Sequence, residues 1–150
     1  MAMNEVARAV GSFRSGHACS QAVVGTWARR FGLEENLALR ISAGFGGGMG
    51  LAGTCGAVTG AVMVLGLAYC DDTCCTKAGR SDLYQTVRLF AEQFRQREGS
   101  LICRELLGCD ITTEAGLKTA QDGNKFGTRC VGLVETAVSL LEVFVPPCAE

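Results

Sequence analysis

The 150-residue sequence, of which 48% is hydrophobic, is long enough for one domain with a sizeable buried core. Its 14 basic and 15 acidic residues nearly balance, and no basic block could neutralise a phosphate backbone, so no nucleic-acid partner is expected. Glu5 and Arg8 interrupt the apolar residues at the N-terminus, which argues against a secretory signal peptide and predicts a cytoplasmic protein. We expect a single domain over residues 1–150, with a core at about 4–145 and a loose tail at 146–150.

The spacing of apolar residues predicts helices throughout the first half of the chain. Positions i, i+3, i+4 and i+7 of a first helix are Val6, Ala9, Val10 and Phe13. Helices are also expected over residues 17–31, closed by Gly32, and over residues 34–43. The next helix should begin with Thr54 as its N-cap and bury a glycine-rich, apolar segment as far as Tyr69.

The second half begins with a polar segment, residues 70–80, which is expected to form a turn. A helix should follow from Ser81, a good N-cap, to Gly99. Further helices are expected over residues 103–107, 113–122 and 126–145, and two prolines stop the last one. Since no run alternates apolar with polar residues, the predicted fold class is all-α, a compact helical bundle around a central buried Gly-rich helix.

Nucleotide binding and membrane insertion are two possible interpretations of the glycine-rich stretch before the central helix, and the surrounding sequence argues against both. Residues 48–53 match G-x-G-x-x-G, but no strand precedes them and no lysine of a Walker loop follows, so nucleotide binding is disfavoured. Residues 41–70 carry no charge, as in a membrane span, but only residues 57–69 are strongly apolar. Because that part is too short to span a bilayer, membrane insertion is not expected.

A thiolate site is the third interpretation of this stretch. Cys55 falls in the first turn of the predicted helix, where the helix dipole lowers the pKa of a thiol. The neighbouring glycines can present backbone N–H groups to a thiolate or a cluster sulfide, and the predicted cofactor-binding set is Gly46, Gly47, Gly48, Gly50 and Gly56. Alternatively, the glycines only make a tight turn and Cys55 is a small buried hydrophobe.

The sequence contains nine cysteines and one histidine. An odd number of cysteines in a reducing compartment argues against a disulfide framework, and no C-x-x-C or C-x-x-C-H motif occurs, which excludes thioredoxin-type sites and covalent haem attachment. Cys19, Cys103 and Cys130 lie on apolar helical faces near helix starts, so together with Cys55 they could form a four-thiolate site. For any one of them, a buried structural thiol is the alternative.

The remaining cysteines have secondary roles in this interpretation. Cys109 is a candidate substitute ligand or resolving thiol because it follows Cys103 closely. A surface metal trap is suggested by the acidic C-D-D-T-C-C segment, which contains Cys70, Cys74 and Cys75. Cys148 lies beyond the final prolines on the expected tail, and no function is assigned to it.

Five ordered motifs together resemble the C_GCAxxG_C_C family of redox-active proteins. They are CSQAV from Cys19, GFGGGMG from Gly44, CGAVTG from Cys55, CRELLG from Cys103, and Cys130. The resemblance covers residues 13–141 and implies a small helical protein whose characteristic cysteines are Cys19, Cys55, Cys103 and Cys130. The family is also similar to the body of split-Soret cytochromes, which implies a homodimer and an iron-sulfur centre, although this chain lacks the haem-attachment motif.

Two classes of redox function are therefore expected, with a structural alternative. In the first, the four thiolates bind a [2Fe-2S] or [4Fe-4S] cluster for electron transfer to an unidentified partner or for redox sensing. In the second, a metal-free oxidoreductase uses Cys55 as the attacking thiol and Cys19, Cys103 or Cys109 as the resolving thiol. The third interpretation is a zinc-binding structural or metal-handling module.

Overall fold

A computed structural model describes residues 4–147, so Cys148 lies outside the described residues. Within this range the chain forms eight α-helices, and the prediction of an all-α fold is confirmed. They are α1 (Glu5–Arg14), α2 (Cys19–Trp27), α3 (Glu35–Ser42), α4 (Gly56–Tyr69), α5 (Lys77–Glu98), α6 (Cys103–Leu107), α7 (Glu114–Asp122) and α8 (Val131–Phe144). Residues 4–147 contain no strand, and Thr54 and Ile102 form an isolated antiparallel bridge.

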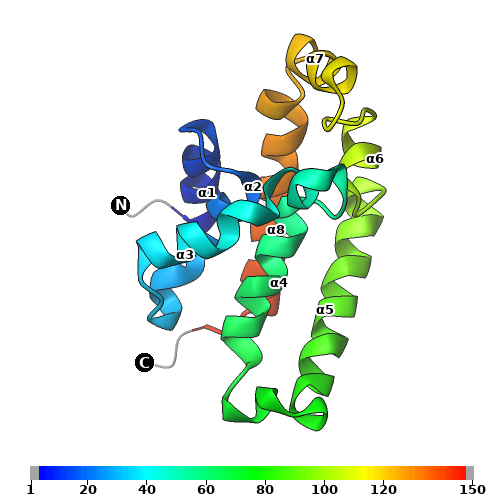
Figure 1. Cartoon of the computed structure of the whole chain (residues 1–150). Coiled ribbons are helices and arrows are strands. Elements are labelled where there is room, and N and C mark those ends of the chain that lie inside the picture. The colour runs from blue at the N-terminus through cyan, green and yellow to red at the C-terminus, as the bar shows by residue number, and fades with distance from the viewer. Residues whose placement is uncertain (1–3, 148–150) are drawn as a thin grey trace.

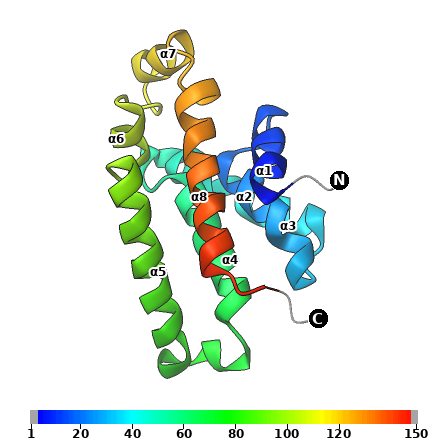
Figure 2. The same ribbon diagram turned by 180° about the vertical axis from the view of Figure 1, so that it is seen from behind.

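Helix α4 is the central element of the bundle, as the apolar glycine-rich sequence predicts (Figure 1). It packs against α2, α5 and α8, while α1 covers α2 and α8. The long α5 runs along one side, and α1, α2 and α3 lie on the other, with α8 between them when seen from behind (Figure 2). The large side chains that are fully buried in this core include Trp27, Phe90, Phe94, Leu65, Leu140 and Leu141.

Glycine allows α2 and α4 to come into close contact. A Cβ atom on Gly60 would lie 3.0 Å from the carbonyl oxygen and 3.1 Å from the Cα atom of Ser20. Backbone atoms cannot rotate away as a side chain can, so a larger residue at this position would push the two helices apart. The start of α2, which carries Cys19, is thereby held against the start of α4.

The starts of two helices differ from the sequence prediction. Helix α5 begins at Lys77 instead of Ser81, because the Thr76 side chain caps the helix by accepting a hydrogen bond from the backbone N–H of Gly79. Helix α4 begins one residue later than expected, with Cys55 as its N-cap. Thr54 does not cap the helix because its backbone takes part in the bridge to Ile102.

The other predicted helices are confirmed with small shifts at their ends. Helix α2 continues as a tighter turn (Ala28–Phe31), which Gly32 closes in the left-handed conformation. Residues 126–145 divide into a wide turn (Phe126–Cys130) and α8, which ends before Pro146. Over residues 4–147, no helix combines the length and the apolar character that crossing a bilayer requires.

Candidate thiol site

The four cysteines singled out by the sequence lie at the starts of four helical segments. Cys19 is the first residue of α2, Cys103 is the first residue of α6, and Cys55 is the N-cap of α4. Cys130 directly precedes α8. All four line a single cavity of about 190 Å³, at the end of the bundle where α6 lies and where α4 and α8 begin (Figures 1 and 2).

Two backbone hydrogen bonds fix Cys55 and Cys103 next to each other. The N–H of Cys55 donates to the carbonyl oxygen of Leu101 at 2.8 Å, and the N–H of Cys103 donates to that of Gly53 at 2.6 Å. These bonds surround the isolated bridge between the two segments. They satisfy backbone groups that the first turn of a helix otherwise leaves unpaired. The positions of the two cysteines therefore depend on the backbone as well as on side-chain packing.

The start of α4 and the loop before it approach the cysteines so closely that they require glycine. A Cβ atom on Gly56 would lie 2.3 Å from the Sγ atom of Cys19, and one on Gly48 would lie 2.9 Å from the Cβ atom of Cys103. Gly48 also has a φ of +64°, which side chains rarely adopt. Here glycine provides the space that two of the cysteines occupy.

The five predicted cofactor-binding glycines do not all lie at the cavity. Gly47 and Gly56 line it, whereas Gly46 packs against Ala18, where a Cβ atom would come within 2.5 Å of the Ala18 Cβ atom. Gly48 lies against Cys103, as described above, and Gly50 has a left-handed conformation with nothing within 4 Å of an added Cβ atom. Only Gly47 and Gly56 are thus placed to face a bound group.

Cys19 and Cys55 form a hydrogen-bonded pair. The pKa of Cys19 is lowered to about 6, chiefly by the hydrogen bond from Cys55 and also by the N–H groups of Gly47 and Ser20, although burial acts to raise it. The same pairing, together with burial, raises the pKa of Cys55 well above its ordinary value. The two thiols therefore titrate as a coupled pair, in which Cys55 favours the charged form of Cys19. The sequence predicted a low-pKa thiol at Cys55 from the α4 dipole alone and did not foresee that Cys55 is coupled to Cys19.

Burial keeps the other two cavity thiols protonated when no cofactor is bound. It raises the pKa of Cys103 to about 11 and that of Cys130 to about 12, and the negative charge of Cys19 contributes in both cases. Arg104 and Arg129 oppose these increases. A bound cation that replaced the protons would remove this penalty on the charged form.

The rest of the cavity wall is apolar. Besides the four cysteines and two glycines, the lining residues are Phe13, Ala18, Leu107, Ile111, Phe126 and Leu133. Such walls exclude water and strengthen electrostatic interactions inside the cavity. No sequence signal marks these residues as cavity lining, because apolar spacing alone cannot distinguish a cavity wall from the rest of the core.

Arg129 anchors the segment that carries Cys130. Its guanidinium group forms an ion pair with the Glu98 carboxylate and donates to the carbonyl oxygen of Glu98 at 2.9 Å and to that of Leu106 at 3.2 Å. The ends of α5 and α6 are thereby tied to the turn before α8. No motif in the sequence identified this residue.

Comparison with known protein families identifies the family to which the chain belongs. The family model described as "Putative redox-active protein (C_GCAxxG_C_C)" matches residues 17–144, most of the chain and all four cavity cysteines. The chain belongs to this family. No curated protein and no solved structure gives a significant match.

Membership in the C_GCAxxG_C_C family supports a redox role for the chain.

Cys109, the predicted substitute ligand, has a free, half-buried thiol that does not line the cavity. Cys109 is among the groups that raise the pKa of Cys103 and of Cys130, so it lies within electrostatic reach of both.

The thiols surround the cavity instead of meeting at one point. Within residues 4–147, no three Cys, His, Asp or Glu side chains lie close enough together to hold a single metal ion. The surface metal trap predicted at residues 70–75 is also not formed, because Cys70 and Cys74 are joined in a disulfide bond.

Proposed function

We propose that this C_GCAxxG_C_C protein is an electron-transfer or redox-sensing protein that binds an iron-sulfur cluster through Cys19, Cys55, Cys103 and Cys130. The observation that supports this best is that all four side chains line one apolar cavity. A bound cluster would supply one-electron chemistry, and its potential would depend on its exposure to solvent and on hydrogen bonds to sulfur.

The donor atoms fit such a group. Thiolates are soft ligands that bind iron-sulfur clusters, copper(I) and zinc. Backbone N–H groups of Gly47 and Ser20 stabilise negative charge on Cys19, and those of Ala57 and Val58 do so on Cys55. Hydrogen bonds of this kind to sulfur are a principal means of adjusting cluster potentials.

A single zinc ion and an iron-sulfur cluster place different demands on the spacing of their thiolate ligands. With Zn–S distances of about 2.3 Å, tetrahedral coordination places the sulfurs only ~3.8 Å from one another. A cluster distributes its thiolate ligands over several iron atoms and so tolerates wider spacing.

Two arginines would reduce the cost of placing negative charge in this apolar cavity. Arg104 donates to the carbonyl oxygens of Ala52 and Leu51 at 3.1 Å, which fixes its guanidinium group beside the start of α6. Arg129 lies on the opposite segment, next to Cys130. Both lower the pKa of the neighbouring cysteine, as positive charges near a thiolate do.

Metal-free thiol-disulfide exchange is a second candidate, because Cys19 and Cys55 are already paired. The Cys19 thiolate would attack an external disulfide and release one thiolate. Cys55 would then attack Cys19 in the mixed disulfide, releasing the second thiol and leaving a Cys19–Cys55 disulfide. In this proposal Cys19 is the attacking thiol because it is more exposed than Cys55, only 4% of which is accessible.

Anaerobic reconstitution with iron and sulfide, followed by visible absorption, distinguishes the two candidates. Substitution of any of the four cavity cysteines by Ser should weaken or abolish the charge-transfer bands, whereas Cys109→Ser and Cys75→Ser serve as controls and should retain them. If no variant differs from the parent and no bands form, the cluster proposal is wrong. A disulfide between Cys19 and Cys55 after mild oxidation would then support the second candidate.

The expected homodimer, the cytoplasmic location and the electron-transfer partner remain predictions. Sedimentation of the purified protein, with and without the cofactor, tests the dimer directly. A monomer under both conditions would contradict the dimer prediction without affecting the cluster proposal.

A further inference from the structure

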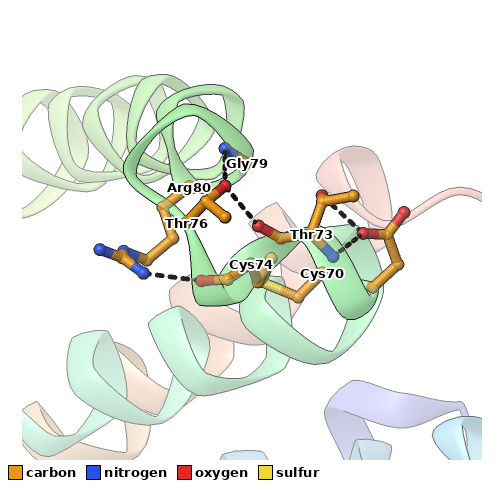
Figure 3. The surroundings of a disulfide bond; sticks show 7 residues. Cys70, Thr73, Cys74, Thr76, Gly79 and Arg80 are labelled. Carbon is orange, nitrogen blue, oxygen red and sulfur yellow. Dashed lines mark hydrogen bonds between the residues drawn. A yellow bond between two sulfur atoms is a disulfide. The ribbon is translucent and has the colours of Figure 1, made fainter.

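The turn between α4 and α5 contains three cysteines that the proposed function does not use. Cys70 and Cys74 form a disulfide bond (Figure 3). Cys75 has a free, exposed thiol. Cys55 and Cys70 cap opposite ends of α4, a helix of 14 residues. At a rise of 1.5 Å per residue the turn is roughly 20 Å from the cavity, so the two groups of cysteines cannot exchange disulfides directly.

Hydrogen bonds hold this turn in place independently of the disulfide bond. The carboxylate of Asp71 accepts from the backbone N–H of Thr73 at 2.8 Å, and the Thr76 hydroxyl donates to the Thr73 carbonyl oxygen at 2.9 Å. The guanidinium group of Arg80 donates to the carbonyl oxygen of Cys74 at 2.8 Å (Figure 3). Opening of the S–S bond therefore need not unfold the turn.

The two bonded cysteines are also accessible to solvent. Both are half-buried, and the residues between them, 71–73, are exposed. Thiol-disulfide exchange requires a thiolate to reach a disulfide sulfur, and access is one of the factors that set its rate. The cavity cysteines Cys55 and Cys103, by contrast, are buried.

From these observations we propose that Cys70 and Cys74 form a second redox site, which exchanges electrons with external thiols and is independent of the cavity. A thiolate RS⁻ attacks one sulfur of the Cys70–Cys74 bond. This bond breaks, a mixed disulfide forms, and the other cysteine leaves as a thiolate. The released cysteine thiolate takes up the proton that the first RSH lost. A second external thiol, as its thiolate, attacks the R sulfur of the mixed disulfide, which releases RSSR and the second cysteine thiolate, and that thiolate takes up the proton of the second RSH. Two electrons and two protons thus pass from two external thiols to the protein, and an external disulfide reverses the reaction.

Differential alkylation of the full-length, air-purified protein tests this site. Free thiols are blocked first, and the native protein is then incubated with either reduced glutathione or a reduced protein dithiol such as thioredoxin. The newly exposed thiols are labelled with a second reagent, and labelled peptides are assigned by mass spectrometry. Cys75→Ser is the matched control, since it removes the adjacent thiol and leaves the disulfide. Circular dichroism reports whether the helices persist.

We expect Cys70 and Cys74 to take up the second label together, with equal gains at the two positions and unchanged helix content. The Cys75→Ser variant should behave in the same way, whereas Cys70→Ser and Cys74→Ser should lose this uptake completely. If glutathione reduces the Cys70–Cys74 bond, small thiols are sufficient reductants of this site. If only the protein dithiol reduces it, the reductant is a protein partner. The proposal is overturned if Cys70 and Cys74 accept the first label, or if neither reductant opens the bond in the folded protein.

Discussion

Gly56→Ala is the most selective perturbation of the thiol site. The added Cβ atom would lie 2.3 Å from the Sγ atom of Cys19, 3.0 Å from the carbonyl oxygen of Phe45 and 3.1 Å from the Cα atom of Gly46. Because nonbonded heavy atoms require about 3.5 Å, the sulfur must move by ~1.2 Å or more. A movement of this size exceeds the tolerance of about 0.5 Å for a preorganised site.

The expected cost in stability is smaller than the effect on the site. Overpacking at Gly56 costs about 1–3 kcal/mol. Alanine is favoured over glycine in a helix by about 1 kcal/mol, so the free energy of unfolding should fall by only about 0–2 kcal/mol. For a chain of this length, each kcal/mol corresponds to roughly 2–4 °C in Tm. Gly56→Ala should thus remain folded while it loses the native position of Cys19.

Gly66→Ala is the matched control in the same helix. No atom lies within 4 Å of a Cβ added at Gly66, so this variant should gain about 1 kcal/mol and keep its site intact. The assay combines urea unfolding with iron bound after anaerobic reconstitution. If Gly56→Ala binds as much iron as Gly66→Ala and its Cys19 reacts with iodoacetamide at the same rate, the reasoning about close packing is refuted.

Further predictions concern protonation and the segment that carries Cys130. In the metal-free protein, the iodoacetamide reaction of Cys19 should have a midpoint near pH 6, and Cys55→Ala should move it upward toward 9.0 because the hydrogen-bond donor is lost. Since the folded pKa of Cys19 is depressed, its contribution to the free energy of unfolding should rise between about pH 6 and 9.0 and vanish below pH 6 in urea titrations. Arg129→Met leaves the carboxylate of Glu98, 12% exposed, without its partner, so the free energy of unfolding should fall by about 1–3 kcal/mol. Lys118→Ala, which removes an exposed ion pair, should change the free energy of unfolding by less than about 0.5 kcal/mol, and equal effects would contradict the role of Arg129.

The fold was largely predictable from sequence because its signals are local. Apolar spacing marked most of the helices, and the predicted bounds of the short helix over residues 103–107 match those of α6. The α4 N-cap was displaced by a contact that is distant in sequence, the bridge between Thr54 and Ile102. The α5 start was missed because Thr76 and Ser81 are both good N-caps, and only the first is used.

The candidate site was predictable to a lesser degree. Helical periodicity indicated inward-facing cysteines, but the proximity of Cys19 to Cys55 depends on how α2 and α4 pack, which no local pattern encodes. The sequence therefore pointed to Cys55 alone and did not reveal its coupling to Cys19. The Cys70–Cys74 disulfide was missed because the expected reducing environment argued against disulfides, although cysteines four residues apart at a helix end can meet. The metal-ligand role of the cavity cysteines stays a prediction.

The most direct test of the central claim is chemical analysis of the protein purified without oxygen. Iron and acid-labile sulfide per chain should be measured on the sample whose visible spectrum is recorded before and after dithionite. A cluster held by Cys19, Cys55, Cys103 and Cys130 predicts iron and sulfide in equal amounts and broad absorption that dithionite bleaches. A colourless protein without iron or sulfide, which also fails to bind them on reconstitution, would contradict the claim.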